Sequence, residues 1–558
     1  MTTGVFYQQG PQLGNQYADD RLLRQTLQRV MPPDVLADIE PDLQRFGERV
    51  VTDIAAFGRD ALANEPTLTP FDPWGRRIDE IQVTQGWKAL KRVSAEEGLV
   101  AIGYERNEAE FSRLYQFAKL YLFNPSSAIY TCPLAMTDGA ARLLEVMGTQ
   151  SLKERALARL TSRDADRFWT SGQWMTERSG GSDVSGTESV ATPDGDGYQL
   201  HGTKWFTSAT TSEMAMTLAR IQGESSLSLF YLETRTGGGA YNHIEIHRLK
   251  DKLGTRALPT AELSMVGTRA TLVGDPGRGV ANISTLFNVT RLYNAVCAAS
   301  GMRRCMALMR DYAGRRKVFG KLLRDQPLHV ETLARMEVEF QGAFQLVFHA
   351  IELMGKEECG QASPDEIAAL RLLTPLVKLY TAKQYVAMAS ETLESFGGAG
   401  YVEDTGLPVI LRDGQVLSIW EGTTNVLSLD ALRAIDKNQS LEALLGLLES
   451  KLGGIQARDL LPAVKQVRAA ATILPKALAS AGSNGVEAIQ STARDIAYAL
   501  TRTYTAALML EHAQWALAEL DDDRAAIAAK RWCDQPLVSI GAHDDAYRAG
   551  SHSLAMDS

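Results

Sequence analysis

The spacing of hydrophobic and polar residues divides the chain into helical and β regions. Between about residues 80 and 165 the apolar spacing is helical, with a turn at Asn124-Pro125. From about 167 to 280, segments such as GYQLHGTKWFTS and SLSLFYLETR alternate or run β-branched, which predicts antiparallel strands. Helical periodicity returns at Ser284, and steps of three and four residues from Leu333 to Met354 form one apolar stripe.

This order predicts an α+β fold with five segments. The first contains one helical stretch near 21–64, and the last is expected to break at 479–485 after a linker at Asp436–Ser440. The predicted boundaries are 1–75 for an N-terminal extension, 76–166 for an N-terminal α-helical domain, 167–280 for a central antiparallel β domain, 281–436 for a C-terminal four-helix-bundle domain and 437–558 for a C-terminal helical extension.

Length, composition and charge describe an ordinary globular protein of several domains. A chain of 558 residues exceeds what one hydrophobic core supports, and 45% hydrophobic with 22% charged residues argues against wholesale disorder. The formal net charge of -9 opposes binding of the whole protein to nucleic acid or to an anionic membrane.

The N-terminus and the cysteines favour the cytoplasm. MTTGVFYQQGPQLGNQYADD has neither the regions of a secretory signal nor the Arg-rich character of a mitochondrial presequence. No apolar run approaches the ~20 residues that span a bilayer, so no membrane association is expected. Wide spacing predicts free thiols in a reducing compartment, and no metal site, for Cys132, Cys297, Cys305, Cys359 and Cys533.

Two segments of the β region combine hydroxyls with glycines or aromatic residues. TERSGGSDVSGT at 176–187 follows a predicted strand, and its paired glycines let backbone N–H groups approach an acceptor-rich ligand closely. KWFTSA at 204–209 places two aromatic residues beside two hydroxyls in a strand. Taken alone, the first is equally typical of a polar β-turn, and the second is more typical of a core strand edge.

Three segments of the helical region have an alternative reading as well. RRKVFGKLL at 315–323 begins at a helix end, where Arg316 suits either phosphate binding or compensation of the helix dipole. ESFGGAGY at 394–401 is a helix stop, typical of a C-cap. SIWEGTTN at 418–425 places Glu421 between a large aromatic residue and a glycine. This setting suits a partly desolvated general base, and a lone surface glutamate is the alternative.

The order and spacing of these five segments resemble the acyl-CoA dehydrogenase superfamily over roughly residues 80–436. The family's TEPxAGSD loop corresponds to TERSGGSD, its KxWITN strand to KWFTSA, and its RxxFG element to Arg316–Gly320. Its FGGxGY turn corresponds to Phe396–Tyr401 and its catalytic YEGTxxQ segment to WEGTTN. The resemblance implies an acyl-CoA dehydrogenase-like fold with FAD as the cofactor.

The resemblance also implies roles for single residues. Glu421 would be the catalytic base, because the position before Arg291 that carries the base in some members is Thr290 here. Phe206 would pack on the flavin ring, and Ser208 would contact flavin N5. The residues implied in FAD binding are Trp174, Met175, Thr176, Ser182, Phe206, Ser208, Arg316, Phe319, Gln326, Glu394, Gly397, Gly398, Thr423 and Asn425. Those implied in substrate binding are Ser182, Arg291, Glu421 and Gly422.

Departures from the family pattern resemble its AidB-like branch. Arg178 replaces a proline, Phe206 replaces a tryptophan, and Glu394 and Asn425 replace glutamines. The segment FDPWGRRIDEI at 71–81 and the long C-terminal extension also fit that branch, which is linked to the alkylation response and acyl-CoA binding.

The implied reaction is α,β-desaturation of a fatty acyl-CoA, with Glu421 taking the α-proton. The resemblance further implies a homotetramer built as a dimer of dimers, and an electron-transferring flavoprotein as acceptor. An acyl-CoA-binding or DNA-protective protein with little turnover is the alternative. Residues 436–558 contain 12 Lys/Arg against 15 Asp/Glu, so charge there gives DNA binding no support. Acyl chain length, the physiological extent of turnover and oxygen as electron acceptor stay open.

Overall fold

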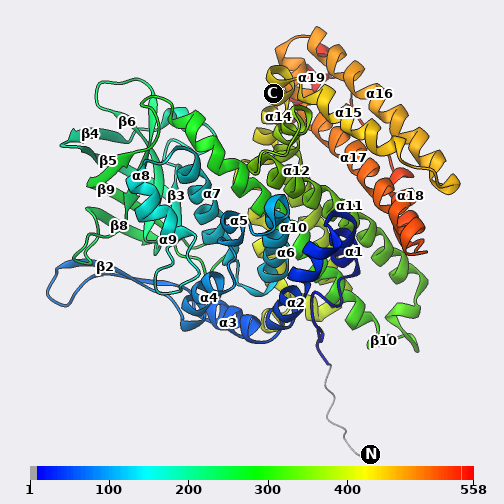
Figure 1. The fold of residues 1–558 in the computed structure, drawn as a ribbon, viewed down its shortest axis with the longest axis horizontal. Helices are drawn as coiled ribbons and strands as arrows, with labels where there is room; N and C mark the ends of the chain where they lie inside the picture. The colour runs from blue at the N-terminus through cyan, green and yellow to red at the C-terminus, as the bar shows by residue number, and fades with distance from the viewer. Residues whose placement is uncertain (1–8, 542, 558) are drawn as a thin grey trace, which may run out of the picture.

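The computed structural model describes residues 9–541 and 543–557, so the first eight residues of the predicted extension lie outside it. A β domain occupies one side of the molecule, long helices run through the centre, and a further helical group lies at the opposite upper corner (Figure 1). The predicted α+β class, with helices on both sides of a central β region, is confirmed.

The N-terminal part is built from short helices and one hairpin. The single helical stretch predicted near 21–64 is three helices, because Pro32-Pro33 starts a new helix and Thr52 interrupts the next. Their buried residues, such as Leu23 and Phe46, belong to the same hydrophobic core as the central helices. The elements are α1 (Arg21–Val30), α2 (Pro33–Arg49), α3 (Asp53–Ala63), β1 (Thr67–Phe71), β2 (Arg77–Gln82), α4 (Gln85–Glu96), α5 (Ile102–Glu105), α6 (Ser112–Phe123), α7 (Thr131–Met147), α8 (Gln150–Leu152) and α9 (Ala158–Leu160).

The β domain is one twisted sheet in the order β3-β6-β4-β5-β9-β7, with β8 paired to β9. Most pairings are antiparallel as predicted, but β6 runs parallel to both β3 and β4. Two successive chain reversals, β4 to β5 and β5 to β6, return β6 to the direction of β4. The strands are β3 (Ser171–Trp174), β4 (Val190–Asp194), β5 (Gly197–Ser208), β6 (Met214–Ile221), β7 (Leu227–Glu233), β8 (Ile244–Leu249) and β9 (Thr260–Leu272).

Three long helices form the centre of the second half. The apolar stripe predicted from Leu333 to Met354 lies on α11, where Phe340, Phe344 and Ile351 are buried. Ser363 and Glu366 form a capping box that starts α12. The elements are α10 (Gly279–Ala313), β10 (Lys317–Val318), β11 (Lys321–Leu322), α11 (Pro327–Glu358), α12 (Pro364–Ser395), α13 (Leu407–Leu417) and α14 (Thr424–Asn438).

The C-terminal helices pack on this centre. The linker predicted at Asp436–Ser440 is wrong, because only Gln439, at φ +50°, separates α14 from α15. The break predicted at 479–485 is confirmed, since Asn484-Gly485 separates α16 from α17. The elements are α15 (Ser440–Gly453), α16 (Leu461–Ser483), α17 (Val486–Glu519), α18 (Arg524–Cys533) and α19 (Asp545–Met556).

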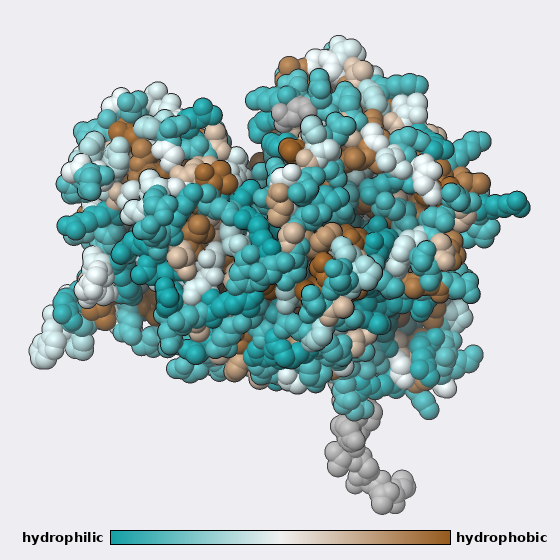
Figure 2. All heavy atoms as spheres, in the orientation of Figure 1, coloured by the Kyte–Doolittle hydropathy of each residue, from teal (hydrophilic) through white to brown (hydrophobic). Residues whose placement is uncertain are grey.

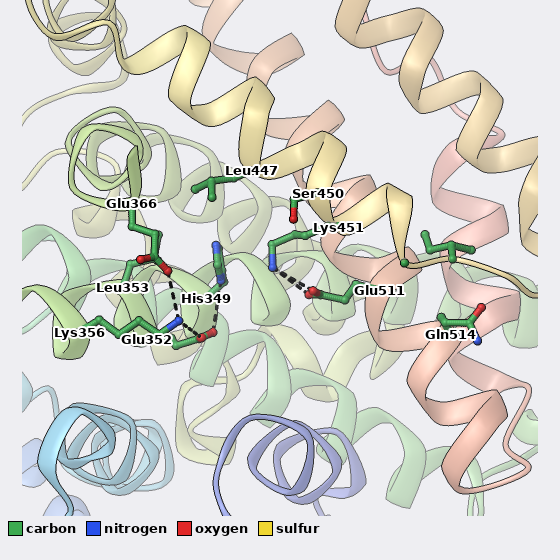
Figure 3. A pocket seen from close by; sticks show the side chains of 12 residues that line it. His349, Glu352, Leu353, Lys356, Glu366, Leu447, Ser450, Lys451, Glu511 and Gln514 are labelled. Atoms are coloured by element: carbon green, nitrogen blue, oxygen red, sulfur yellow. Dashed lines mark hydrogen bonds and ion pairs between the residues drawn. The ribbon is translucent and has the colours of Figure 1, made fainter. Parts of the chain in front are cut away.

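A cavity of about 320 Å³ lies where α11 meets α15 and α17. Its charged groups pair with one another: Lys451 lies 3.0 Å from Glu511, and Lys356 lies 2.9 Å from Glu352 (Figure 3). None of the site residues predicted from the sequence lines this cavity.

The surface is mainly hydrophilic, with hydrophobic residues in small scattered groups, and it is hollowed between the β domain and the C-terminal helices (Figure 2). Among the described residues, no helix combines the length and the apolar character that crossing a bilayer requires.

Candidate active site

Glu421 lies in a tight turn between α13 and α14 whose backbone is left-handed. The φ angle is +58° at Glu421 and +106° at Gly422. A residue with a Cβ adopts this conformation at a cost of about 1–2 kcal/mol, so the surrounding contacts must hold it. A Cβ at Gly422 would come within 2.9 Å of Leu427 Cδ2. The backbone of the turn is therefore strained at Glu421, the predicted base, and the next position, Gly422, has no room for a side chain.

The carboxylate of Glu421 accepts hydrogen bonds from two neutral side chains on different elements. Thr290 Oγ1, on α10, donates to Oε2 over 2.7 Å. Gln173 Nε2, on β3, donates to Oε1 over 3.4 Å. The sequence prediction named Thr290 only as the alternative position of the base, and it missed Gln173. Because both donors are uncharged, they orient the carboxylate without neutralising it.

Two cationic side chains bind the carbonyls of the same turn. Arg291 Nε donates to the Glu421 carbonyl over 3.4 Å, while its Nη1 pairs with Asp430 at 2.7 Å. Lys378 Nζ, from α12, donates to the Gly422 carbonyl over 2.6 Å. Burial alone would raise the pKa of Asp430, but hydrogen bonding from Arg371 and the charge of Arg291 hold it below its usual range. Arg291, predicted to meet substrate, thus also supports the backbone of the base.

Lys378 is a site residue that the sequence analysis missed. Its side chain is fully buried. Burial lowers the pKa of its amine to about 7. The negative charge of the Glu421 carboxylate acts in the opposite direction and raises this pKa, but by less. The signal that could have found it is a lysine inside the apolar run PLVKLY of a predicted helix.

The 176–187 loop is fixed to strand β5 by a buried ion pair. Glu177 Oε1 lies 2.6 Å from Lys204 Nζ, and the same carboxylate accepts hydrogen bonds from the Ser189 hydroxyl and the Glu188 N–H. Burial opposes ionisation of Glu177, but Lys204 and these donors hold the pKa of the carboxyl below its usual range. This pair brings the two predicted β-region segments together.

Within this loop, Thr176 and Ser182 lie in different surroundings. The Thr176 carbonyl accepts a hydrogen bond from the Trp205 N–H over 2.9 Å. A Cβ at Gly181 would lie 2.5 Å from Thr176 Oγ1, so only glycine fits there. Thr176 is half-buried, whereas Ser182 is exposed.

Strand β5 presents Phe206 and Ser208 at its end. Phe206 is 50% exposed, because a bulge between Lys204 and Thr207 turns its ring outward. Ser208 Oγ lies 3.2 Å from Thr260 Oγ1. The ammonium of Lys250 lies 4.4 Å from the centre of the Phe206 ring. This end of the strand therefore offers an open aromatic face beside a hydroxyl.

Trp174 and Met175, in contrast to Phe206 and Ser208, have buried side chains. The Trp174 side chain is buried in the core of the β domain, and its indole Nε1 has no hydrogen-bond partner among the described residues. The Met175 side chain is buried in the neighbouring core against α7. A ligand beside these two residues would meet their backbone rather than their side chains.

The other predicted cofactor residues gather at the far end of the helices. Tyr312, at the end of α10, stacks on Phe396 with ring centres 4.4 Å apart, which joins the 315–323 segment to the 394–401 turn. In the first segment Phe319 is 99% exposed and Gln326 donates to the Val318 carbonyl over 3.0 Å. The exposed residues of the second are Glu394, Gly397, Gly398 and Tyr401.

These two groups of residues do not meet within one chain. At 1.5 Å per residue, Thr290 and Tyr312 lie ~33 Å apart along α10. Figure 1 shows the hairpin β10–β11 on the opposite side of the molecule from strand β5. Thr423 and Asn425 are exposed at the start of α14, next to the Glu421 turn.

Comparison with known protein families matches consecutive parts of the chain. Residues 9–167 match the adaptive response protein AidB N-terminal domain, and residues 172–267 match the acyl-CoA dehydrogenase middle domain. Residues 277–435 match the acyl-CoA dehydrogenase C-terminal domain, and residues 439–558 match the acyl-CoA dehydrogenase 11 C-terminal domain-like family.

A relative from Caenorhabditis elegans, acyl-CoA dehydrogenase family member 11, is 44% identical and covers 96% of this chain and 90% of its own length. The chain belongs to the acyl-CoA dehydrogenase family. The putative acyl-CoA dehydrogenase AidB of Escherichia coli (strain K12) is 32% identical over 70% of this chain and 72% of its own length. These matches confirm the predicted AidB-like branch of the family.

A solved structure shows the same fold as this acyl-CoA dehydrogenase family member. Caenorhabditis elegans ACDH-11 in complex with C11-CoA superposes with a TM-score of 0.96 at 42% identity, over 100% of this chain and 98% of that one. The predicted acyl-CoA dehydrogenase-like fold is thereby confirmed.

Proposed function

We propose that this chain is a FAD-dependent acyl-CoA dehydrogenase in which Glu421 removes the α-proton of a fatty acyl thioester. The observation that carries the proposal is the Glu421 turn. Its carboxylate is held by neutral donors, and its backbone N–H has no hydrogen-bond partner among the described residues. An N–H left free beside a base is a donor for the thioester carbonyl, where it would stabilise the negative charge of the enolate.

The residues of the proposed site fit FAD. Phe206 offers an open ring face, Ser208 a neighbouring hydroxyl, and Gly397 and Gly398 leave open space above their backbone. When bound, FAD would supply the two-electron chemistry that accepts the β-hydrogen of the substrate as hydride. The loop from Thr176 to Ser182 and the exposed Thr423 and Asn425 would hold the flavin end on the same chain.

The chain's own residues carry the proton step. Glu421 takes the α-proton onto a carboxylate oxygen and becomes a neutral acid. Thr290 and Gln173 hold the carboxylate at the approach that this transfer needs. Trp420 packs against the hydrophobic core beside the turn, which limits water around the base. Arg291 and Gly422, at the same turn, and Ser182, on the 176–187 loop, are proposed to contact the substrate.

We propose that each FAD is shared between two chains of a homotetramer built as a dimer of dimers. The ~33 Å separation of the two residue groups along α10 supports this, because a second chain must supply one group. Phe319 and Tyr401 are 99% and 90% exposed in the single chain. The Tyr312–Phe396 contact joins the two segments that carry them, and neighbouring exposed apolar side chains are typical of an interface. Arg316, Gln326 and Glu394 would meet the flavin of the neighbouring chain.

We propose a cytoplasmic location and an electron-transferring flavoprotein as the electron acceptor. Cys132, Cys297, Cys305, Cys359 and Cys533 are all free thiols, which agrees with a reducing compartment.

The test is anaerobic mixing of the purified yellow protein with a series of saturated acyl-CoAs, with C11-CoA included because the relative binds it. Bleaching of the flavin absorbance by at least one acyl-CoA supports the proposal. Spectral perturbation without bleaching would instead identify an acyl-CoA-binding protein. Failure to bind FAD on reconstitution would contradict the cofactor assignment.

A further inference from the structure

The Gly422 carbonyl, which follows the base, is bound by the amine of a buried lysine. Lys378 Nζ donates to the Gly422 carbonyl over 2.6 Å, and its side chain is fully buried. Within the described residues, no carboxylate lies within 4.0 Å of this nitrogen. Lysine is almost never fully buried unless it is paired with an opposite charge. Burial of Lys378 therefore opposes folding, and its position needs a reason other than stability.

The reason lies in the backbone that it binds. Glu421 and Gly422 are consecutive residues with positive φ, and each has a carbonyl bound by one cationic side chain. The bond from Arg291 is long, at 3.4 Å, and Asp430 already neutralises that guanidinium. The bond from Lys378 is shorter by 0.8 Å and comes from an amine that forms no ion pair among the described residues. Lys378 thus makes the stronger restraint on the turn.

We propose that Lys378 is a positioning residue for the catalytic base, which holds the Gly422 carbonyl so that Glu421 keeps its left-handed backbone. The inference rests on the proposed function, since it assigns a role toward the same base. Without this donor the half-buried Gly422 carbonyl would lose the hydrogen bond that fixes it, so the peptide would rotate to find another partner. Rotation there turns both the free N–H and the side chain of Glu421 away from their present directions.

Two substitutions of similar length separate hydrogen bonding from packing. Lys378→Met fills the same space without a donor, and Lys378→Gln keeps a neutral N–H donor. Lys383→Met is the matched control, because Lys383 is an exposed lysine on the same helix. Each holoprotein is mixed anaerobically with the acyl-CoA that bleaches wild type fastest, and both the limiting rate of flavin reduction and the acyl-CoA dissociation constant are measured.

For Lys378→Met we expect the limiting rate to fall by ~10²-fold, the scale of a misplaced catalytic group, with little change in acyl-CoA affinity. Lys378→Gln is expected to lie between Met and wild type, because its amide keeps an N–H donor but carries it on a shorter side chain. Lys383→Met is expected to match wild type. Equal losses in the Met and Gln variants would show a packing role and overturn the inference, as would a wild-type rate in Lys378→Met.

Hydrogen exchange of the 418–424 segment gives a second readout that needs no turnover. Faster exchange in Lys378→Met than in Lys378→Gln and wild type supports the inference, and equal exchange in all three overturns it. If no acyl-CoA bleaches wild type, the proposed function fails and the exchange result alone decides the role of Lys378. If Lys378→Met does not fold, a slowed limiting rate in Lys378→Gln supports the inference, and unchanged rate and exchange overturn it.

Discussion

The Thr290 hydroxyl donates a 2.7 Å hydrogen bond to Glu421 Oε2, although the two residues are 131 positions apart in the chain. The bond joins α10 to the turn before α14. The family resemblance places a base at either residue 421 or residue 290, and this bond brings the two positions together in space. A carboxylate carried by residue 290 would therefore reach the place that the Glu421 carboxylate occupies.

We therefore expect that the catalytic carboxylate can be transferred from residue 421 to residue 290. Glu421→Gly should abolish flavin reduction by acyl-CoA while it removes the strain of a left-handed Glu. Adding Thr290→Glu should recover at least about tenfold of the ~10²–10⁴-fold loss expected on removing a base. The rate is measured by anaerobic stopped flow. Thr290→Gln in the same Glu421→Gly background is the control. Recovery by Gln would show that the restored rate does not come from a base, and no recovery by Glu would show that a carboxylate at residue 290 does not reach the position of the Glu421 carboxylate.

Removal of one partner of the Glu177–Lys204 ion pair should destabilise the β domain more than removal of both partners. Glu177→Gln leaves Lys204 fully buried without a counter-charge, which should lower the free energy of unfolding by about 3–5 kcal/mol. Lys204→Met added to Glu177→Gln removes the second charge and should recover most of that loss. Urea unfolding of both variants checks this, and equal stabilities of the single and double variants would refute it.

The exposed Phe319 should act at a subunit interface. Phe319→Glu places a charge at the tip of the β10–β11 hairpin and should reduce both the mass in light scattering and the FAD content per chain. Leu554→Glu is the control, since Leu554 is similarly exposed on the C-terminal helix α19. An unchanged tetramer with full FAD in Phe319→Glu would contradict the shared site.

Titration of Lys378 should make stability depend on pH in a defined window. In the folded protein its pKa is about 7, against a usual value of 10.5, so between these pH values only the unfolded chain binds the proton. The free energy of unfolding of wild type should then rise with pH, by at most about 1.4 kcal/mol per pH unit from this group.

Lys378→Met removes that contribution, so its stability relative to wild type should fall as the pH is raised from about 7 toward 9. The difference between Lys383→Met and wild type should change much less over the same range, because the charge of Lys383 makes only a minor contribution to the lowered pKa of Lys378. Urea unfolding at several pH values measures both differences. A difference for Lys378→Met that does not change with pH would place the ammonium in a more solvated site than the structure shows.

Much of the fold follows from local patterns in the sequence. The apolar stripe of α11 and the alternation of β5 are visible in single windows, because side chains on one face of an element share one environment. The parallel pairing of β6 with β3 and β4 is not visible there, since it depends on the path of the chain between strands. The packing of the N-terminal helices on the main core is likewise not visible in a local stretch of sequence, because it depends on contacts between residues far apart in the chain.

Some residues of the candidate site are likewise visible in local sequence patterns, and others are not. Glu421 and Phe206 stand out from their neighbours in the chain, and their predicted roles come from the family resemblance. Gln173 and Lys378 do not, because each reaches the turn from a distant element, and the one signal for Lys378, its place in an apolar helical run, does not say what it binds. A lysine within an apolar helical run and a glutamine at the end of a short strand acquire meaning only when the three-dimensional contacts are known.

The central claim, that Glu421 is the base, is tested most directly by Glu421→Gln. The amide has nearly the same shape, so Thr290 can still bond to it and FAD should remain bound, but it cannot accept the α-proton. Anaerobic mixing with the acyl-CoA that bleaches wild type fastest should show flavin reduction slowed by more than the ~10²–10⁴-fold typical of losing a general base, with acyl-CoA affinity changed much less. Equal bleaching rates in wild type and Glu421→Gln would contradict the account.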